Sequence, residues 1–241
     1  MAGIDGNTVL LLHCDGSDGA TTFTDISDSI HAITAVGNAQ VDTAQSKFGG
    51  AALLCDGTGD YLTVPDHANF NFGTGNFTWD FWVRFASLSN EDGLIGISNS
   101  ASGQDTANMT TLRLDPSAGS TNINFRVDEA SSTLIDFNGA HGMVADTWYH
   151  VALVRGWGGN ANDWAITING SSVATTTVSM TMPNFTSVVR IGDDPRSGNS
   201  PLNGWLDEVR VSNVARWTTN FTPPTEAYSR PSGGLVLFEV W

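Results

Sequence analysis

Short segments of alternating apolar and polar residues, separated by turn dipeptides, recur along this chain. The clearest segment places a large apolar residue at every second position: Phe77, Trp79, Phe81, Val83 and Phe85. Successive side chains of a β-strand point to opposite faces, so this spacing predicts a long central strand with an aromatic face in the core. Trp82 would then lie on the opposite face.

The same kind of pattern predicts strands along most of the chain. We expect them at Val9–Cys14, Ala51–Cys55, Tyr61–Val64, Leu94–Ser98, Thr111–Leu114, Ile123–Val127, Thr133–Asn138, Trp148–Arg155, Trp164–Ile168, Ser171–Thr177, Val188–Ile191 and Gly204–Ser212. Asp-Gly and Asn-Gly pairs lie between them, and Asn169-Gly170 predicts a tight hairpin. No segment has a helical pattern beyond one turn at Asn213–Thr218. An all-β sandwich is therefore expected.

Composition agrees with this fold class and limits the partners. The chain has 241 residues, of which 40% are hydrophobic and 15% charged, as suits many short strands joined by turns in one large sandwich. The formal net charge is -15 with no basic run, which argues against nucleic acid because a phosphate backbone requires clustered Lys and Arg. The acidity has two interpretations: solubility, or oxygen-rich loops that bind a hard cation such as calcium.

The first residues and the hydropathy pattern bear on location. The apolar run Val9–Leu12 is too short for a secretory signal, and no basic residue precedes it. No stretch approaches the roughly 18 apolar residues of a membrane span, so no membrane partner is expected. The expectation is a protein that stays in the cytosol or leaves by a route such as cell lysis.

The chain has two cysteines, Cys14 and Cys55, each at the end of an apolar run and directly before Asp-Gly. They are either small buried thiols or, if their strands are neighbours, a disulfide worth about 2–4 kcal/mol. We favour the thiols because nothing else indicates an oxidising compartment. His150 has apolar neighbours and is interpreted as a core histidine rather than a ligand or a base.

The chain divides near residue 229. Residues 1–228 form the predicted sandwich, and Ser229–Gly234 is a short polar linker. The tail that follows is apolar apart from Glu239 and contains Leu235, Val236, Leu237, Phe238, Val240 and Trp241. Such a tail either folds back onto the sandwich or adds as a strand to another chain. We favour a role in assembly, within a homo-oligomer or onto a shell.

Four segments spread along residues 8–228 carry a family resemblance when taken in order. They are LLLHCDGSDGATTFTDIS, AQSKFGGAALLCDGTGDYLTVPDHANFNFGTGNFTWDFWVRF, DTWYHVALVR with ITING, and LNGWLDEVRVSNVARWTTNFTPP. Together they resemble concanavalin A-like sandwiches of the laminin-G-like type, as found in bacteriophage virion proteins. The resemblance implies two antiparallel sheets packed face to face with jelly-roll connections.

The resemblance also implies a calcium ion at one edge of the sandwich. The matching residues are Asp15, Asp25, Asp28, Asp207 and Glu208. Calcium takes six to eight oxygen ligands, which carboxylates and carbonyls of a loop can supply. The chain departs from the family pattern at Asp25-Ile26-Ser27-Asp28, where relatives often have Asp-Ser-Ser-Gly. The alternative is that these carboxylates cap turns.

Catalytic motifs are missing from the sequence. The Glu-x-Asp-x-Glu string of related glucanases, which places two carboxylates on one strand, does not occur. Asp128-Glu129 and Asp207-Glu208 are adjacent pairs expected to point to opposite faces of their strands. No Gly-x-Ser-x-Gly, His-Glu-x-x-His or phosphate loop is present. We therefore expect a protein that is not an enzyme.

One loop has the composition of a glycan site. Trp157 and Trp164 flank a Gly- and Asn-rich loop, where Asn160, Asn162 and Asp163 could donate and accept hydrogen bonds. Aromatic rings stack on sugars, but Trp164 also begins a predicted strand and Trp157 could cover the sandwich edge. A structural role is favoured for both tryptophans.

Two functions remain. The favoured one is a structural virion protein, such as a capsid decoration protein, head fibre or tail-associated subunit, with other virion proteins or itself as partner and glycans as an additional ligand. Its location would be the virion, assembled in the host cytoplasm. The alternative is an extracellular carbohydrate-binding module or lectin that recognises cell-surface or environmental polysaccharide.

Overall fold

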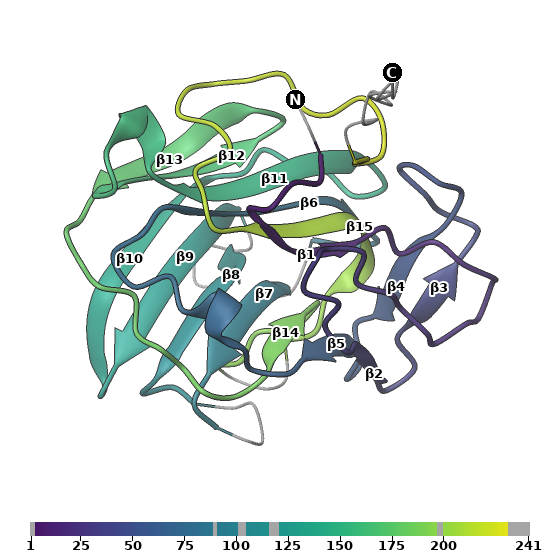
Figure 1. Ribbon diagram of the computed structural model, residues 1–241. Coiled ribbons are helices and arrows are strands. Elements are labelled where there is room, and N and C mark those ends of the chain that lie inside the picture. The colour runs from purple at the N-terminus through teal and green to yellow at the C-terminus, as the bar shows by residue number, and fades with distance from the viewer. Residues whose placement is uncertain (1–2, 89–90, 101–104, 116–120, 197–199, 231–241) are drawn as a thin grey trace, which may run out of the picture.

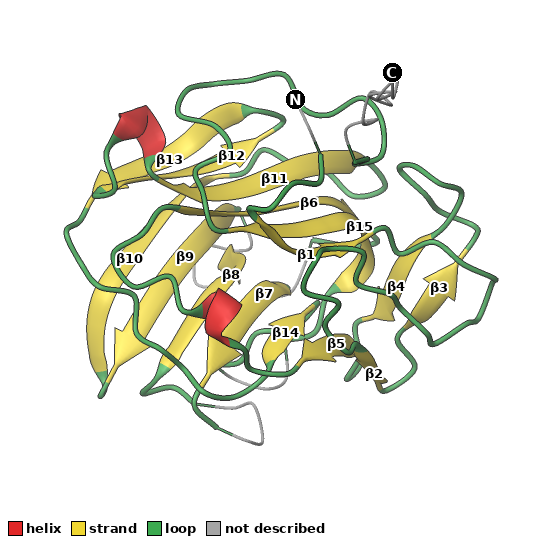
Figure 2. Cartoon of the chain, in the orientation of Figure 1, coloured by secondary structure: helices red, strands yellow, loops and turns green. Residues whose placement is uncertain are grey.

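The computed structural model describes residues 3–88, 91–100, 105–115, 121–196 and 200–230. Among these, strands form two antiparallel sheets, and the rest is loops and two short 3₁₀ helices, Ala68–Phe70 and Trp157–Gly159 (Figure 2). No helix in the described part of the chain is long and apolar enough to cross a membrane.

Sheet A has eight strands. In spatial order they are β13 (Ser171–Thr177), β12 (Asp163–Ile168), β11 (Trp148–Arg155), β6 (Phe77–Phe85), β15 (Asn203–Ser212), β4 (Ala52–Asp56) and β3 (Gln40–Asp42), with β1 (Thr8–Leu12) also paired with β15. The long strand predicted at Phe77–Phe85 is confirmed with these bounds, and it lies between β11 and β15 (Figure 1).

Sheet B has seven strands and packs against the inner face of sheet A. Its order is β10 (Ser132–Ala140), β9 (Asn122–Glu129), β8 (Met109–Asp115), β7 (Gly93–Ser98), β14 (Val189–Ile191), β5 (Tyr61–Val64) and β2 (Thr34–Val36). In both sheets a run of consecutive strands is followed by strands far away in the sequence, as in β11–β6–β15 and β7–β14–β5, which confirms the predicted two-sheet jelly-roll sandwich. The three-residue strands β2 and β3 were not predicted, because neither carries an apolar run.

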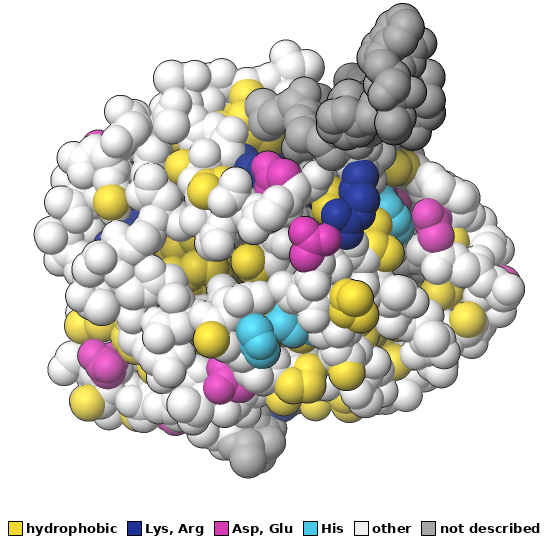
Figure 3. Space-filling view, in the orientation of Figure 1, with side chains coloured by type: hydrophobic (Ala, Val, Ile, Leu, Met, Phe, Trp, Pro, Cys, Tyr) yellow, Lys and Arg dark blue, Asp and Glu magenta, His cyan; other side chains and the backbone are white. Residues whose placement is uncertain are grey.

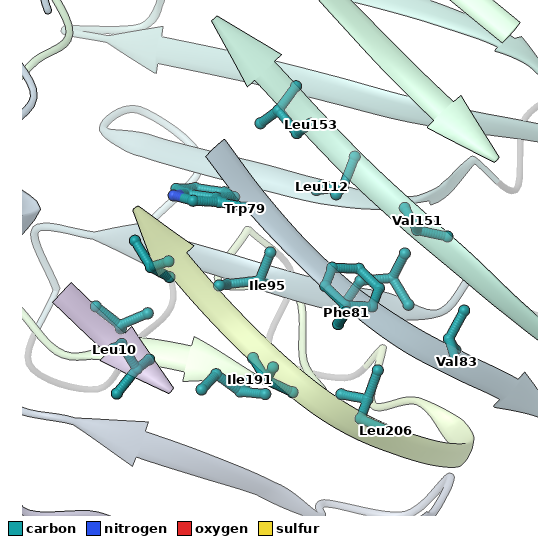
Figure 4. Packing of buried hydrophobic residues seen from close by; sticks show 14 of the residues in the cluster. Leu10, Trp79, Phe81, Val83, Ile95, Leu112, Val151, Leu153, Ile191 and Leu206 are labelled. Carbon is teal, nitrogen blue, oxygen red and sulfur yellow. The ribbon is translucent and has the colours of Figure 1, made fainter. Parts of the chain in front are cut away.

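The core lies between the sheets. Trp79, Phe81 and Val83 of β6 point toward side chains of sheet B such as Ile95 and Leu112 (Figure 4). Trp79 and Phe81 are 1% exposed, so the aromatic face is buried as the alternation indicates. Burial of this kind is the main force that holds the sheets together.

The hairpin at Asn169-Gly170 is confirmed. Ile168 pairs with Ser171, and both turn residues have positive φ, 49° and 77°. Two residues with positive φ make the turn whose twist matches the flanking strands. By contrast, the helical turn predicted at Asn213–Thr218 is wrong, because this segment runs as irregular chain across sheet A.

Two predictions about side-chain chemistry are confirmed. Cys14 and Cys55 are both buried free thiols, and burial raises the pKa of each well above its usual value. His150 is fully buried. Trp148 lies on the same strand face as His150, but it is partly exposed and is not a core residue.

Candidate functional site

The outer face of sheet A, which points away from sheet B, is half covered by one segment. We call residues 213–230 the strap; it follows β15 and runs over the outside of the sheet as the yellow-green to yellow chain of Figure 1. The strap is fastened by backbone hydrogen bonds to Gly170 and Gly158, and its Trp217 packs on Ala152 and Val154 of β11. The other half of the face is not covered by the strap.

A buried charged network lies under the strap. Arg210 donates to both carboxylate oxygens of Asp80, at 2.9 and 3.2 Å, and the two side chains are 1% and 0% exposed. The Tyr228 hydroxyl donates to the same carboxylate, and His150 Nε2 lies 3.5 Å from it. Burial alone would raise the pKa of Asp80, but the charge of Arg210 and the hydrogen bond from His150 outweigh burial and lower it.

The strap also encloses a cavity of about 330 Å³, which we call the strap cavity. It is lined by Gly3, Arg210, Trp217, Thr222, Pro223, Pro224, Thr225, Glu226, Ala227, Tyr228 and Ser229. Trp217 is 6% exposed, and its Nε1 has no hydrogen-bond partner among the described residues. An indole N–H left unpaired in a buried position costs about 1–3 kcal/mol.

Beyond the strap, the outer face carries a row of partly exposed residues from neighbouring strands. Arg84 of β6 is directly opposite Trp148 of β11 on one side and Trp205 of β15 on the other. The Arg84 guanidinium lies 4.9 Å from the centre of the Trp205 ring and donates to Asp146 at 2.7 Å. We call Trp148, Arg84 and Trp205 the tryptophan row.

The next residues inward on the same strands are buried. Trp82 of β6 lies opposite His150 and Asp207. Lys47 covers the Trp82 ring, with Nζ 3.9 Å from the ring centre. On this half of the face, the residues of the tryptophan row are therefore partly exposed, whereas the next residues along β11, β6 and β15 are buried.

The carboxylates predicted for calcium are not brought together. Among the described residues, no group of three or more His, Cys, Asp or Glu side chains could hold a metal ion. Asp25 instead accepts backbone hydrogen bonds from Leu11, Ser27 and His31, and so caps its own loop. Asp28 is exposed and pairs with Arg230 at 2.8 Å.

The remaining three, Asp15, Asp207 and Glu208, lie near one another: in addition to burial, the charge of Glu208 raises the pKa of Asp15, and both charges raise the pKa of Asp207. One oxygen of Glu208 accepts from Tyr228 N and the other contacts His13 Nδ1 at 2.5 Å. Asp207 accepts from the backbone of Lys47 and Phe48 through Oδ2, and its Oδ1 has no hydrogen-bond partner in the described chain. Several oxygens of the predicted set therefore already accept hydrogen bonds within the protein, while Asp207 Oδ1 does not. The calcium ion stays a prediction of the resemblance.

The expected directions of Asp207 and Glu208 were wrong. Glu208 has φ 52°, and the pairing of β15 with β6 shifts between Asp207 and Arg210. This bulge turns Glu208 to the outer face, where Asp207 also lies. Burial raises the pKa of Asp207 to about 7, and the charge of Glu208 adds to the effect.

The predicted glycan loop is mostly structural. Trp164 is fully buried, packs on Phe77 and Phe125, and cannot reach a ligand. Trp157 is half-buried against the strap cluster around Trp217. The polar residues close the turn on themselves, since Asn160 accepts from the backbone of Asn162, and Asp163 accepts from Thr177.

The predicted assembly residues, Leu235, Val236, Leu237, Phe238, Val240 and Trp241, lie outside the described residues. The strap cavity and the tryptophan row were missed by sequence reasoning. Trp148 and Trp205 were visible as aromatic residues on strands, but their common row depends on which strands are neighbours.

Solved structures of similar fold come from bacterial toxins. The binding domain of Paraclostridial Mosquitocidal Protein 1 matches with a TM-score of 0.65 and 15% identity over 88% of this chain and 50% of that chain. The botulinum neurotoxin serotype D binding domain matches with a TM-score of 0.64 and 14% identity, over 89% and 50%. The binding domain of botulinum neurotoxin DC in complex with SialylT matches with a TM-score of 0.62 and 15% identity, over 88% and 49%.

This chain thus spans about half the length of each of these domains, and at such identities the likeness shows the fold alone. No curated protein matches the chain. Residues 56–219, more than half of the chain, match the Laminin_G_3 family, described as the concanavalin A-like lectin/glucanases superfamily. The chain therefore belongs to the concanavalin A-like lectin/glucanases superfamily.

Proposed function

We propose that this chain is a non-enzymatic domain that binds a glycan in the strap cavity. Sugars present apolar C–H faces and a dense set of hydroxyl groups, so their sites combine flat apolar walls with a few placed polar groups. The strap cavity has both: Trp217, Pro223 and Pro224 supply apolar walls, while Thr222 and Thr225 supply hydroxyl groups. Its volume of about 330 Å³ lies within the range of small-ligand sites.

The observation that carries the proposal is the apolar wall that Trp217 forms in the strap cavity. The Trp217 ring is fixed by stacking on Phe221, with centroids 3.9 Å apart and planes 6° apart. A fixed ring loses little side-chain freedom when a ligand binds. The apolar face of a sugar ring can pack on such a wall.

The lining supports binding rather than glycoside hydrolysis. Two carboxyl groups flank the scissile bond in most glycoside hydrolases, and their separation sets the stereochemical outcome. Glu226 is the single acidic residue that lines the strap cavity in the described chain. Asp80 lies beneath the cavity floor but is held by Arg210 and Tyr228.

A conservative variant tests the proposal. Trp217→Phe keeps an aromatic ring against Phe221 but removes the N–H, so the melting temperature should be unchanged or slightly raised. Affinity for the best ligand of a glycan array should fall about tenfold, because the smaller ring removes part of the aromatic wall of the cavity. Trp157→Phe makes the same chemical change outside the cavity and should bind as the wild type does. If Trp217→Phe binds the glycan as tightly as the wild type does, the glycan does not bind in the strap cavity.

Assembly on a phage virion is the finer proposal. It is supported by the family resemblance of residues 8–228 and by the apolar residues of the tail, from Leu235 to Trp241. Deletion of residues 231–241 should then change the oligomeric state or abolish incorporation into particles, measured by light scattering and by particle sedimentation. A truncated chain with unaltered oligomeric state and particle binding would contradict it.

A further inference from the structure

The strap is fastened at both ends but not in its middle. On one side Phe221 N donates to Gly170 O at 2.9 Å, and on the other Tyr228 N donates to Glu208 at 2.7 Å. Residues 222–227 lie between these two bonds, and within the described chain none of them forms a hydrogen bond or an ion pair. All six line the strap cavity. We call residues 222–227 the lid.

The composition of the lid makes it a stiff piece of chain. Pro223 and Pro224 have fixed φ angles and no N–H groups, and a proline also restricts the residue before it, here Thr222. Thr222, Thr225 and Glu226 are exposed. Charged side chains are few and scattered on the face seen in Figure 3, in keeping with a surface segment that no ion pair holds. An exposed segment without hydrogen bonds opens at a lower cost than the sheets beneath it.

The two ends of the lid are held differently. The Phe221 ring stacks on Trp217, with centroids 3.9 Å apart, and both pack with Ala152 and Val154 of β11. This end is therefore part of the apolar layer on sheet A. At the Tyr228 end, by contrast, contacts come from the N-terminal residues, the purple chain beside the end of the strap in Figure 1.

Residues 3–5, which we call the clamp, hold this second end. Ile4 N donates to Ser229 O at 3.1 Å, and the Ile4 side chain, 3% exposed, packs with Tyr228. Gly3 lies so close to the strap that a Cβ atom would be 2.7 Å from Ser229 N and 2.8 Å from Tyr228 Cα. The end of the lid therefore rests directly on the clamp.

The clamp also reaches the start of the strap. Asp5 accepts from Arg216 through both carboxylate oxygens, at 2.7 and 2.8 Å. The hydrogen bond from Arg216 lowers the pKa of Asp5 to about 2, so the pair stays charged at neutral pH. The same three residues thus tie both ends of the strap to the sandwich.

We infer that the lid is the entrance of the strap cavity and that the clamp controls how often it opens. When Tyr228 and Ser229 separate from Gly3 and Ile4, the lid loses its support at one end and swings outward about the Phe221 end. This control of access presupposes the proposed function only in that a ligand enters the cavity. The opening itself takes place without one.

Cleavage by a Glu-specific protease measures the opening, because Glu226 lies in the lid and cleavage follows the population of the open form. Ile4→Ala should speed cleavage after Glu226 at least about tenfold, since it removes buried packing against the strap. Gly3→Ala should act in the same direction, because its Cβ collides with the backbone of the strap. Ile30→Ala makes the matched change at an isoleucine that is 75% exposed, and it should be cleaved as the wild type is.

A second glutamate distinguishes lid opening from loss of the whole fold. Glu129 is exposed at the end of β9 in sheet B and is a site for the same protease. Global destabilisation would speed cleavage after both glutamates. The ratio of cleavage after Glu226 to cleavage after Glu129, read by mass spectrometry, should therefore rise in both clamp variants. A ratio equal to that of the wild type would overturn the lid and the clamp.

Hydrogen exchange tests the direction of the swing. The amides of Phe221 and Tyr228 are hydrogen-bonded at the two ends of the lid. The clamp variants should speed exchange of the Tyr228 amide severalfold and leave that of Phe221 unchanged. Equal acceleration at both ends would contradict a lid that opens from the clamped end.

The outcomes keep this inference apart from the proposed function. A cleavage ratio that responds to the clamp, in a protein that binds no glycan of the array, would support the lid and overturn the proposed function. Glycan binding that is weakened in Trp217→Phe, together with a cleavage ratio unaffected by the clamp variants, would overturn the lid and leave the proposed function standing.

Discussion

Each half of the outer face of sheet A contains an Arg–Asp ion pair beside an aromatic ring, but the two pairs differ in burial. Under the strap, Arg210 pairs with Asp80 and lies 3.8 Å from the Tyr228 ring centre, with both charged side chains at 1% exposure or less. In the tryptophan row, Arg84 pairs with Asp146 and lies against Trp205, but the carboxylate is 70% exposed. The first pair is buried at both partners, whereas the second joins a largely buried guanidinium, 14% exposed, to an exposed carboxylate.

The largest expected effect is loss of the buried pair. Arg210→Ala leaves Asp80 buried without its cation and should lower the free energy of unfolding by about 3–5 kcal/mol. Denaturant titration measures this. The double variant Arg210→Ala with Asp80→Ala should cost less than the two single variants added together, because no unpaired charge remains. If the losses of free energy in the two single variants simply add in the double variant, Arg210 and Asp80 do not stabilise the fold through their interaction.

A second contrast within the face concerns two fully buried carboxylates, Asp80 and Asp207. Asp80 has Arg210 and a lowered pKa, whereas burial raises the pKa of Asp207 to about 7. Asp207 in the folded state therefore binds a proton more readily than the unfolded chain does, between about pH 4 and pH 7. Its contribution to stability is present at low pH and is lost as the pH rises through this window.

Replacement of Asp207 should remove that dependence. Between pH 5 and pH 8, the free energy of unfolding of the wild type should fall by roughly 2–3 kcal/mol more than that of Asp207→Asn. Denaturant titrations at the two pH values, in EDTA, measure the difference. Equal pH dependence in both proteins would break the contrast with Asp80.

The exposed pair should contribute little to stability. Arg84→Ala removes the ion pair with Asp146, and pairs at the surface are typically worth less than about 1 kcal/mol. The melting temperature should therefore stay close to that of the wild type, and salt should not enlarge the difference. A loss as large as that of Arg210→Ala would show that the ion pair of Arg84 stabilises the fold as much as the buried pair does, despite its exposed carboxylate.

Strand positions could be predicted, but long-range pairings could not. The bounds of β6 follow from alternation of large apolar residues, and those of β11 from apolar residues on both faces, as a strand buried on both sides requires. Arg210 and Asp80 are separated by 130 residues, and nothing local in the sequence links them. The tryptophan row likewise depends on the strand order β11, β6, β15, which a crossover topology sets and a single sequence does not reveal.

Local geometry explains the failures among the acidic residues. The positive φ of Glu208 belongs to a bulge at a residue that rarely adopts it, so strand alternation gave the wrong direction. Asp25 resembles a metal ligand by position, yet it caps its loop through backbone N–H groups, the alternative that short polar side chains often take. Both outcomes depend on the backbone path rather than on residue type.

The smallest expected effect concerns calcium. In the described chain Asp80 forms a salt bridge with Arg210 but Asp207 forms none, and a calcium ion is a candidate partner for its unpaired Oδ1. The neighbouring oxygens of Glu208 are occupied by His13 and by the Tyr228 backbone, and those of Asp25 by its own loop. A ligand that binds only the folded state raises the melting temperature. Because these oxygens are already occupied, addition of EDTA and then of millimolar calcium should shift the melting temperature by less than about 1 °C. A clear rise that Asp207→Asn abolishes would place a calcium ion at this carboxylate and would make the two halves of the face alike, each with its own buried cation.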